Sequence, residues 1–143
     1  MSATAQGAGG ERAPAERLGF SNGDVVLEIG YDDDCDDALR ASVASGVGSA
    51  LLEDDAEDVV DVVLLWWRDD DGDLVDALVD ALSFLGSGGV IWLLTPKAGR
   101  AGHVEPSDIG EAAPTAGLSS TKSTSAAQDW SGTRLVAPKV SRR

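Results

Sequence analysis

Residues 25–37 read VVLEIGYDDDCDD, and this stretch decides the fold that we expect. Five residues suited to a buried strand run into Gly30, and a series of aspartates then opens a helical pattern. A strand, a glycine turn and a helix N-terminus together form the place at which many α/β proteins hold a ligand. Here aspartates stand where a nucleotide-binding turn carries glycines. The stretch predicts an α/β fold with an altered ligand turn.

Length and composition indicate one soluble domain. The chain has 143 residues, which is the size of a single domain, and its one cysteine, Cys35, fits a reducing compartment. The first ten residues lack the apolar region of a secretory signal, and no apolar run is long enough to span a membrane. We therefore expect a cytoplasmic protein.

The negative charge is concentrated in the first half of the fold. The formal net charge is -14, and residues 24–80 carry 19 acidic residues against Arg40 and Arg68. Such a field repels nucleic acid and anionic membranes and favours cations or a basic protein surface. The alternative interpretation is that the acid only keeps the protein soluble.

Hydrophobic periodicity predicts a three-layer Rossmann-like domain over residues 18–138, between a disordered tail at 1–17 and a basic tail at 139–143. We expect a mostly parallel sheet of about five strands that ends in an antiparallel hairpin. Strands are predicted at residues 25–29, 59–67, 90–94, 121–127 and 133–138, and helices at 35–45, 74–85 and 106–117. Pro114 should kink or shorten the last helix, and residues 49–58 fit a helical turn or a loop equally well.

This order of elements resembles a shortened methyltransferase-type Rossmann fold. VLEIG at residues 26–30 resembles its first motif, DVVDVV at 58–63 its fourth strand and GGVIWL at 88–93 its fifth, while the hairpin corresponds to its last two strands. In that fold, the second and third strands normally carry the acid that holds the ribose. The gap between the first two matching segments of this chain is too short for those strands. Asp32 and Asp34 stand at the glycine positions of the turn, and they add bulk and negative charge near the carboxylate of S-adenosylmethionine. These departures argue against S-adenosylmethionine as a cofactor.

A second resemblance covers almost the whole chain. The stretches LEIGYDDDCDDALR, DVVDVVLLWWRDDDGDLVDALVDAL, GGVIWLLTPKAGR and DWSGTRLVAPK are similar to an actinobacterial family, domain of unknown function 3052. That family brings no established activity with it.

Three loops should meet at one edge of the sheet, because loops that follow parallel strands lie at the strands' carboxyl ends. Residues 31–37 and 68–73 bring carboxylates to this edge, and residues 95–105 bring Lys97, Arg100 and His103. One interpretation is a Mg²⁺ or Ca²⁺ site, with the basic loop holding a phosphate on the metal. The metal ligands would be Asp32, Asp34, Asp69 and Asp70. The other interpretation is that the acids cap two helices and the basic loop neutralises them; the spacing of DDD and DDDGD is not that of a calcium loop.

The remaining reactive and aromatic residues point away from catalysis. Cys35 lies between Asp34 and Asp36, which disfavour a thiolate, and a loop histidine such as His103 is more often structural than catalytic. Trp130 lies in a polar loop, where it is either tucked over the end of the sheet or offered as a contact anchor.

The sequence thus favours a non-catalytic interaction or regulatory protein that has no cofactor and binds a basic protein surface. The alternative is a small divalent-metal-dependent enzyme that acts on a phosphorylated or anionic metabolite. The candidate binding residues are Tyr31, Asp32, Asp33, Asp34, Asp69, Asp70, Asp71, Lys97, Arg100, His103 and Trp130.

Overall fold

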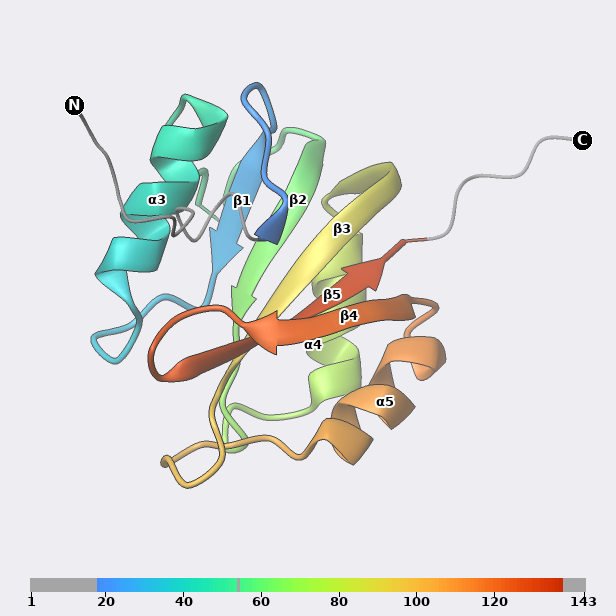
Figure 1. Ribbon diagram of the computed structural model, residues 1–143. Helices are drawn as coiled ribbons and strands as arrows, with labels where there is room; N and C mark the ends of the chain where they lie inside the picture. Colours follow the sequence, from blue (N-terminus) through green and yellow to red (C-terminus); the bar gives the residue numbers. More distant parts are fainter. Residues whose placement is uncertain (1–17, 54, 138–143) are drawn as a thin grey trace, which may run out of the picture.

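A five-stranded mixed sheet forms the centre of the computed structural model, which describes residues 18–53 and 55–137 (Figure 1). The strand order is β1-β2-β3-β5-β4. The elements are β1 (Val26–Ile29), α3 (Asp37–Val47), β2 (Val60–Trp66), α4 (Leu74–Leu82), β3 (Leu85–Pro96), α5 (Pro106–Thr115), β4 (Ser119–Ser125) and β5 (Trp130–Val136). The expected tails at 1–17 and 139–143 lie outside the described residues.

The first three strands are parallel, and the last two form the antiparallel part of the sheet. Leu27 pairs with Val63 of β2, and Val63 pairs with Ile91 of β3. β5 inserts between β3 and β4 and runs antiparallel to both, with Leu135 opposite Ile91. The expected α/β class and the closing hairpin are therefore confirmed.

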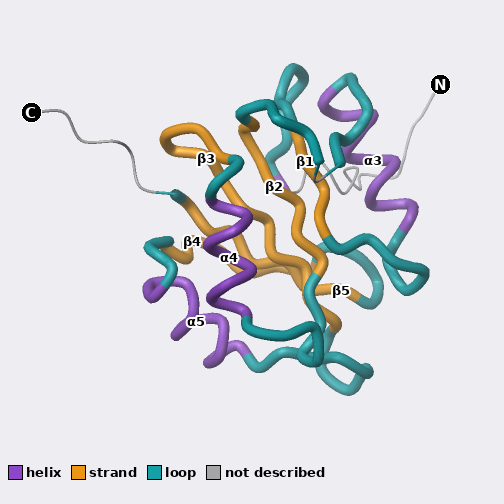
Figure 2. Tube along the Cα trace, turned by 180° about the vertical axis from the view of Figure 1, so that it is seen from behind, coloured by secondary structure: helices purple, strands orange, loops and turns teal. Residues whose placement is uncertain are grey.

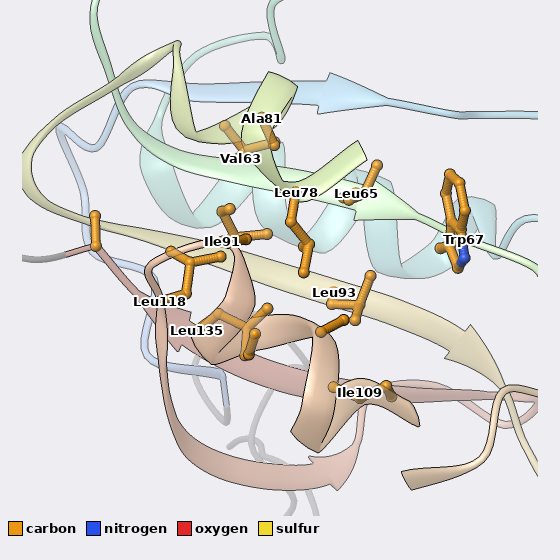
Figure 3. Close-up of a cluster of buried hydrophobic side chains, with 14 of the residues drawn as sticks. Val63, Leu65, Trp67, Leu78, Ala81, Ile91, Leu93, Ile109, Leu118 and Leu135 are labelled. Carbon is orange, nitrogen blue, oxygen red and sulfur yellow. The ribbon is translucent and has the colours of Figure 1, made fainter. Parts of the chain in front are cut away.

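Helices cover both faces of the sheet, because each parallel connection crosses from one strand end to the other over a face. Figures 1 and 2 show α3 on one face and α4 and α5 on the other. On the second face, α4 directs Leu78 and Ala81 toward Val63 and Ile91 of the sheet (Figure 3). Trp66 belongs to the core on the α3 face and has no exposed surface.

Aspartates begin two of the helices. The Asp36 carboxylate accepts a hydrogen bond from the backbone N–H of Leu39 at 2.8 Å, and Asp73 caps α4 in the same manner. A side-chain oxygen at this position satisfies one of the N–H groups that a helix leaves free at its start. One interpretation of the sequence was that the acids cap two helices, and Asp36 and Asp73 do so. α3 begins two residues later than predicted, so Cys35 and Asp36 also lie before it, together with Asp32 and Asp34.

Other boundaries differ from the prediction where local pattern is weak. β3 begins at Leu85 because that residue pairs with Val60, so the strand includes residues 86–89, which lie between the predicted helix and the predicted strand, and α4 ends at Leu82. α5 ends at Thr115, one residue after Pro114, so the proline lies in the last turn. Both hairpin strands begin two or three residues earlier than predicted, because β4 is almost entirely hydroxylated and has no apolar alternation to fix it.

A single β-bridge takes the place of a further strand beside β1. The backbone N–H of Glu28 donates to Leu52 O at 2.8 Å, and the N–H of Leu52 donates to Val26 O at 2.9 Å. The ambiguous segment 49–58 is thus mainly loop in its described residues. None of the helices within 18–53 and 55–137 has the length and apolar character that crossing a membrane requires.

Candidate functional site

The three predicted loops meet at the carboxyl ends of β1, β2 and β3. They surround a hollow of about 400 Å³, here called the acidic hollow. The backbone N–H of Asp69 donates to Gly102 O at 2.9 Å and so joins the second loop to the third. The acidic hollow is lined by Asp32, Asp33, Asp34, Arg68, Asp70, Asp71, Ala101 and Gly102.

Arg68 connects the first two loops across this hollow. Its guanidinium donates from Nε to the Asp34 carboxylate at 3.0 Å and from Nη1 to Gly30 O at 2.8 Å. A second contact joins Nη2 to Asp34, and Asp71 accepts from Nη1 at 3.4 Å. Nη2 also lies 3.2 Å from the Cys35 sulfur. With only 13% of its side chain exposed, Arg68 lies between the ends of β1 and β2.

Arg68 and burial together set the protonation of the groups around it. Its hydrogen bonds hold the pKa of the Asp34 carboxyl below the usual value, and Asp34 in turn raises the pKa of Arg68. Burial raises the pKa of Cys35 to about 11, so that its thiol stays protonated near neutral pH. A protonated thiol is a poor nucleophile.

Trp130 closes the crevice from the antiparallel side of the sheet. It is 3% exposed, and its indole N–H donates to Asp34 O at 3.1 Å. Its ring packs edge-on against Trp66 with centroids 4.9 Å apart, and the Arg68 guanidinium lies 5.3 Å from its centre. The sequence allowed Trp130 either to be tucked over the end of the sheet or to be an exposed contact anchor. In the structure it is tucked over the end of the sheet.

Gly30 lets the first loop approach the end of β2. Its φ is +86°, and a Cβ atom there would lie 2.4 Å from Trp66 O. Such a contact is too short for any side chain, so glycine is required here for space as well as for conformation. A second hollow of about 440 Å³ lies beside Gly30 on the α4 side, with Tyr31, Asp32 and Ala77 in its lining. Asp32, Arg68 and Asp71 line both hollows.

Glu28, Arg40 and Tyr31 form a second linked group at the start of α3. Arg40 binds Glu28 through Nε at 2.6 Å and Nη2 at 2.8 Å, and Trp66 Nε1 donates to Glu28 at 2.8 Å. The Arg40 guanidinium also lies 3.8 Å from the centre of the Tyr31 ring. The Tyr31 hydroxyl donates to Asp37 at 2.9 Å, and this hydrogen bond raises the pKa of Tyr31. Tyr31 is thus held by its neighbours although 43% of its surface is exposed.

The basic residues of the third loop do not face the acidic hollow, contrary to the expectation that they would lie with the aspartates. Arg100 pairs with Asp129 at 3.3 Å, and the backbone N–H of Lys97 donates to Asp129 O at 3.0 Å. His103 donates from Nδ1 to Pro96 O at 2.9 Å and lines a different pocket under α5. Arg100 turns toward the hairpin because Asp129 lies there, whereas the ring of His103 is held by Pro96 and Glu105.

The four aspartates proposed as metal ligands do not form a compact ligand set. Among the described residues, no three His, Cys, Asp or Glu side chains lie close enough together to hold a metal ion. The Asp34 carboxylate forms an ion pair with Arg68, while Asp32, Asp69 and Asp70 are exposed. The arrangement is that of an acidic surface around one internal arginine.

The residues that the sequence analysis missed as site residues are Glu28, Arg40 and Arg68. The sequence did contain a signal for the two arginines. They are the only basic residues of the strongly acidic segment 24–80, so each of them can form an ion pair with one of several carboxylates. The motif VLEIG contains Glu28, but its pattern does not show which cation it binds.

The class of fold is that of the methyltransferase-type Rossmann proteins. A methyltransferase of Pyrococcus furiosus superposes with a TM-score of 0.54 over 88% of this chain and 80% of its own, at 14% identity. An S-adenosylmethionine-dependent methyltransferase of Aquifex aeolicus gives a TM-score of 0.54 over 86% and 88% of the two chains, at 12% identity. At these identities the likeness shows the fold alone.

Sequence comparison then gives the family. The model of the family described as "Protein of unknown function (DUF3052)" matches residues 15–139, and the chain belongs to this family. Uncharacterized proteins of Mycobacterium tuberculosis and Mycobacterium bovis are each 52% identical to it over 125 residues, which cover 87% of this chain and 78% of theirs. The resemblances noted from the sequence, to this family and to the shortened methyltransferase fold, are both confirmed.

Proposed function

We propose that this protein is a non-catalytic interaction or regulatory protein whose acidic strand-end surface binds a basic surface of a protein partner. The observation that carries this proposal is the position of Arg68. In open α/β sheets the ligand crevice lies outside the carboxyl ends of the strands. Here the arginine occupies that crevice and joins Gly30 O to the Asp34 carboxylate.

The surface around the crevice supplies the binding charge. Asp32, Asp33, Asp69 and Asp70 are exposed, and Arg68 is the one cation in the lining of the acidic hollow. Because Asp34 and Asp71 already neutralise Arg68, the exposed aspartates keep their full negative field. Such a field speeds the approach of a positively charged partner and repels phosphate and nucleic acid.

A charge-reversal pair tests this proposal against a matched control. In the rim variant, Asp33 and Asp70 are both changed to Lys; both line the acidic hollow, and Arg68 pairs with Asp34 and Asp71 instead. In the control, Glu57 and Asp58, which are exposed at the opposite end of β2, receive the same changes. Tagged protein is recovered from the source cells and the co-purifying proteins are identified. We expect basic partners with the unchanged protein and the control, and their loss with the rim variant. Equal recovery by all three proteins would refute the assignment of the surface.

Thermal shift distinguishes this function from the metal-enzyme alternative. Millimolar Mg²⁺, Mn²⁺ or Ca²⁺ should not raise the melting temperature, because no compact ligand set exists among the described residues. Stabilisation by one of these ions that is lost in the rim variant would favour the enzyme.

A further inference from the structure

A separate pocket lies under α5, apart from the two hollows beside Arg68, and its floor is made of hydroxyl groups. We call it the hydroxyl pocket. It has a volume of about 360 Å³ and lies between α5, the loop before it and the strands β3, β5 and β4. It is lined by Thr95, His103, Val104, Pro106, Ile109, Gly110, Ser120, Ser123, Thr124, Ser131, Gly132 and Thr133.

The floor comes from neighbouring positions on one face of the sheet. Thr95 of β3 pairs with Ser131 of β5, and Thr133 of β5 pairs with Ser123 of β4. Side chains of such cross-strand pairs lie side by side. Alternation along β5 places Thr133 on the face of Leu135, which packs in the core under α4 and α5. The hydroxyls thus interrupt a face that is otherwise apolar, and Figure 3 shows Ile109 of α5 near Leu93 on this face.

Two of these hydroxyls are buried and have no partner in the described part of the chain. Thr95 is 3% exposed and Thr133 is 6% exposed. Neither hydroxyl makes a hydrogen bond with any residue of 18–53 or 55–137. Buried polar groups in folded proteins almost always have a partner, because an unsatisfied one loses its hydration without compensation. Both side chains line the hydroxyl pocket, so a bound molecule there can supply the missing hydrogen bonds.

We infer that the hydroxyl pocket is a binding site for a small neutral polyhydroxylated ligand, of the size of a single sugar ring. The lining contains no Lys, Arg, Asp or Glu, which argues against an ion of either sign as the ligand. Val104, Pro106 and Ile109 provide an apolar wall, as a sugar's C–H groups require, while the hydroxyls face its O–H groups. The volume lies at the lower end of the roughly 300–1,000 Å³ of ligand sites, which limits the ligand to about one ring.

His103 completes the site from the loop before α5. Its Nδ1 donates to Pro96 O at 2.9 Å, so Nε2 can act as an acceptor whenever the ring carries only that one N–H. Glu105, the nearest ionic partner, lies 3.6 Å from Nε2. A ligand hydroxyl can donate to Nε2 while it accepts from a threonine. The site therefore offers both donors and acceptors, which is the pattern that a polyol matches.

NMR titration of the whole chain tests this inference. D-ribose and D-glucose are added separately to the ¹⁵N-labelled protein, with inorganic phosphate as the anionic probe and benzene as the apolar probe. We expect one of the sugars to give saturable amide shifts confined to the residues around Thr95, Val104 and Thr133, and phosphate and benzene to give none there. Absence of a localised shift with either sugar, or saturable binding of only phosphate or benzene in this pocket, would overturn the inference.

Thr95→Val and Thr133→Val then show whether the two hydroxyls bind the sugar. Each change keeps the branched shape and removes one hydroxyl, so each should weaken sugar binding about tenfold, the equivalent of one hydrogen bond. Thr121→Val is the control, since Thr121 lies on β4 outside the pocket and bonds Arg134 instead. The melting temperature of the free Val variants should equal or exceed that of the unchanged protein, which separates lost binding from lost folding. Unchanged sugar affinity in both pocket variants would contradict the assignment. This test does not involve the aspartates of the acidic hollow, so it can fail while the proposed function stands.

Discussion

The acidic hollow and the hydroxyl pocket differ in how their polar groups find partners. In the first, Arg68 is shared by Gly30, Asp34, Asp71 and the Cys35 sulfur, so that charges from two loops hold one another. In the second, the hydroxyls of Thr95 and Thr133 are buried and have no partner among the described residues. The first region is completed by the chain itself, while the second can be completed by a bound molecule.

This difference separates polar groups that hold the fold together from polar groups that are available for binding. Removing a paired group leaves its partner buried and unsatisfied, and this costs stability. Removing an unpaired buried hydroxyl eliminates a desolvation penalty and should gain stability. Substitutions in the two regions should therefore change the free energy of unfolding in opposite directions.

The largest effect is expected for Gly30→Ala. The added Cβ would lie 2.4 Å from Trp66 O at a φ of +86°, so we expect a loss of about 3 kcal/mol or more in the free energy of unfolding. Gly99→Ala is the matched control, because Gly99 has a φ of +87° and no atom within 4 Å of its Cβ position. The control should lose only the conformational term of about 1 kcal/mol. If urea unfolding gave the same loss of stability for Gly30→Ala and Gly99→Ala, the backbone at Gly30 would have room for a Cβ atom beside Trp66 O.

Arg68→Met should have the next largest effect. Breaking a buried ion pair costs about 3–5 kcal/mol and an exposed one less than about 1 kcal/mol. Because Arg68 is 13% exposed and Asp34 is 50% exposed, we expect about 2 kcal/mol. Arg100→Met, which removes the exposed pair with Asp129, should change stability by less than about 0.5 kcal/mol. A loss for Arg68→Met no larger than that for Arg100→Met would mean that Arg68 does not organise the crevice.

Asp34→Asn should show a smaller effect that depends on pH. Arg68 lowers the pKa of Asp34 in the folded chain, so the stability from this pair is present above the unfolded pKa and is lost as pH falls through the folded one. We expect unchanged protein to exceed the variant by about 1 kcal/mol at neutral pH, and the difference to shrink between about pH 4 and pH 2. The measurement is urea unfolding across that range. A difference that is constant with pH would contradict the pairing.

Thr133→Val should have the smallest effect and the opposite sign. Removing a buried unpaired hydroxyl should raise the free energy of unfolding by about 0.5–1 kcal/mol in the absence of ligand. Thr121→Val, at an exposed position, should stay within about 0.5 kcal/mol of zero. Destabilisation by Thr133→Val in the same urea series would mean that its hydroxyl has a partner, and the contrast between the two regions would disappear.

The fold could be predicted from sequence because its signals are local. The apolar runs VVLEI and VVDVVLLWW have the composition of covered parallel strands, and Asp73 has the position of a helix cap. The shift of α3 and the length of β3 could not be predicted. They depend on which of several aspartates caps the helix and on the pairing of Leu85 with Val60, which is a long-range contact.

The site was predicted at the level of loops but not of side chains. Parallel topology brings the three loops together, as expected, but topology does not fix where a side chain points. Arg100 turns toward the hairpin because Asp129 lies there, and this neighbour is far away in the sequence. No pattern in the sequence predicts the hydroxyl pocket, because Thr95 and Thr133 become neighbours of α5 only after the hairpin folds back.

The claim that the chain fills its own cofactor crevice is tested most directly by calorimetric titration with S-adenosylmethionine. The unchanged protein is titrated to millimolar ligand beside Arg68→Met. Because the Arg68 guanidinium occupies the crevice between Gly30 and Asp34, we predict no saturable heat for the unchanged protein. Saturable binding of one S-adenosylmethionine per chain, lost on Gly30→Ala in protein that is still folded, would contradict it.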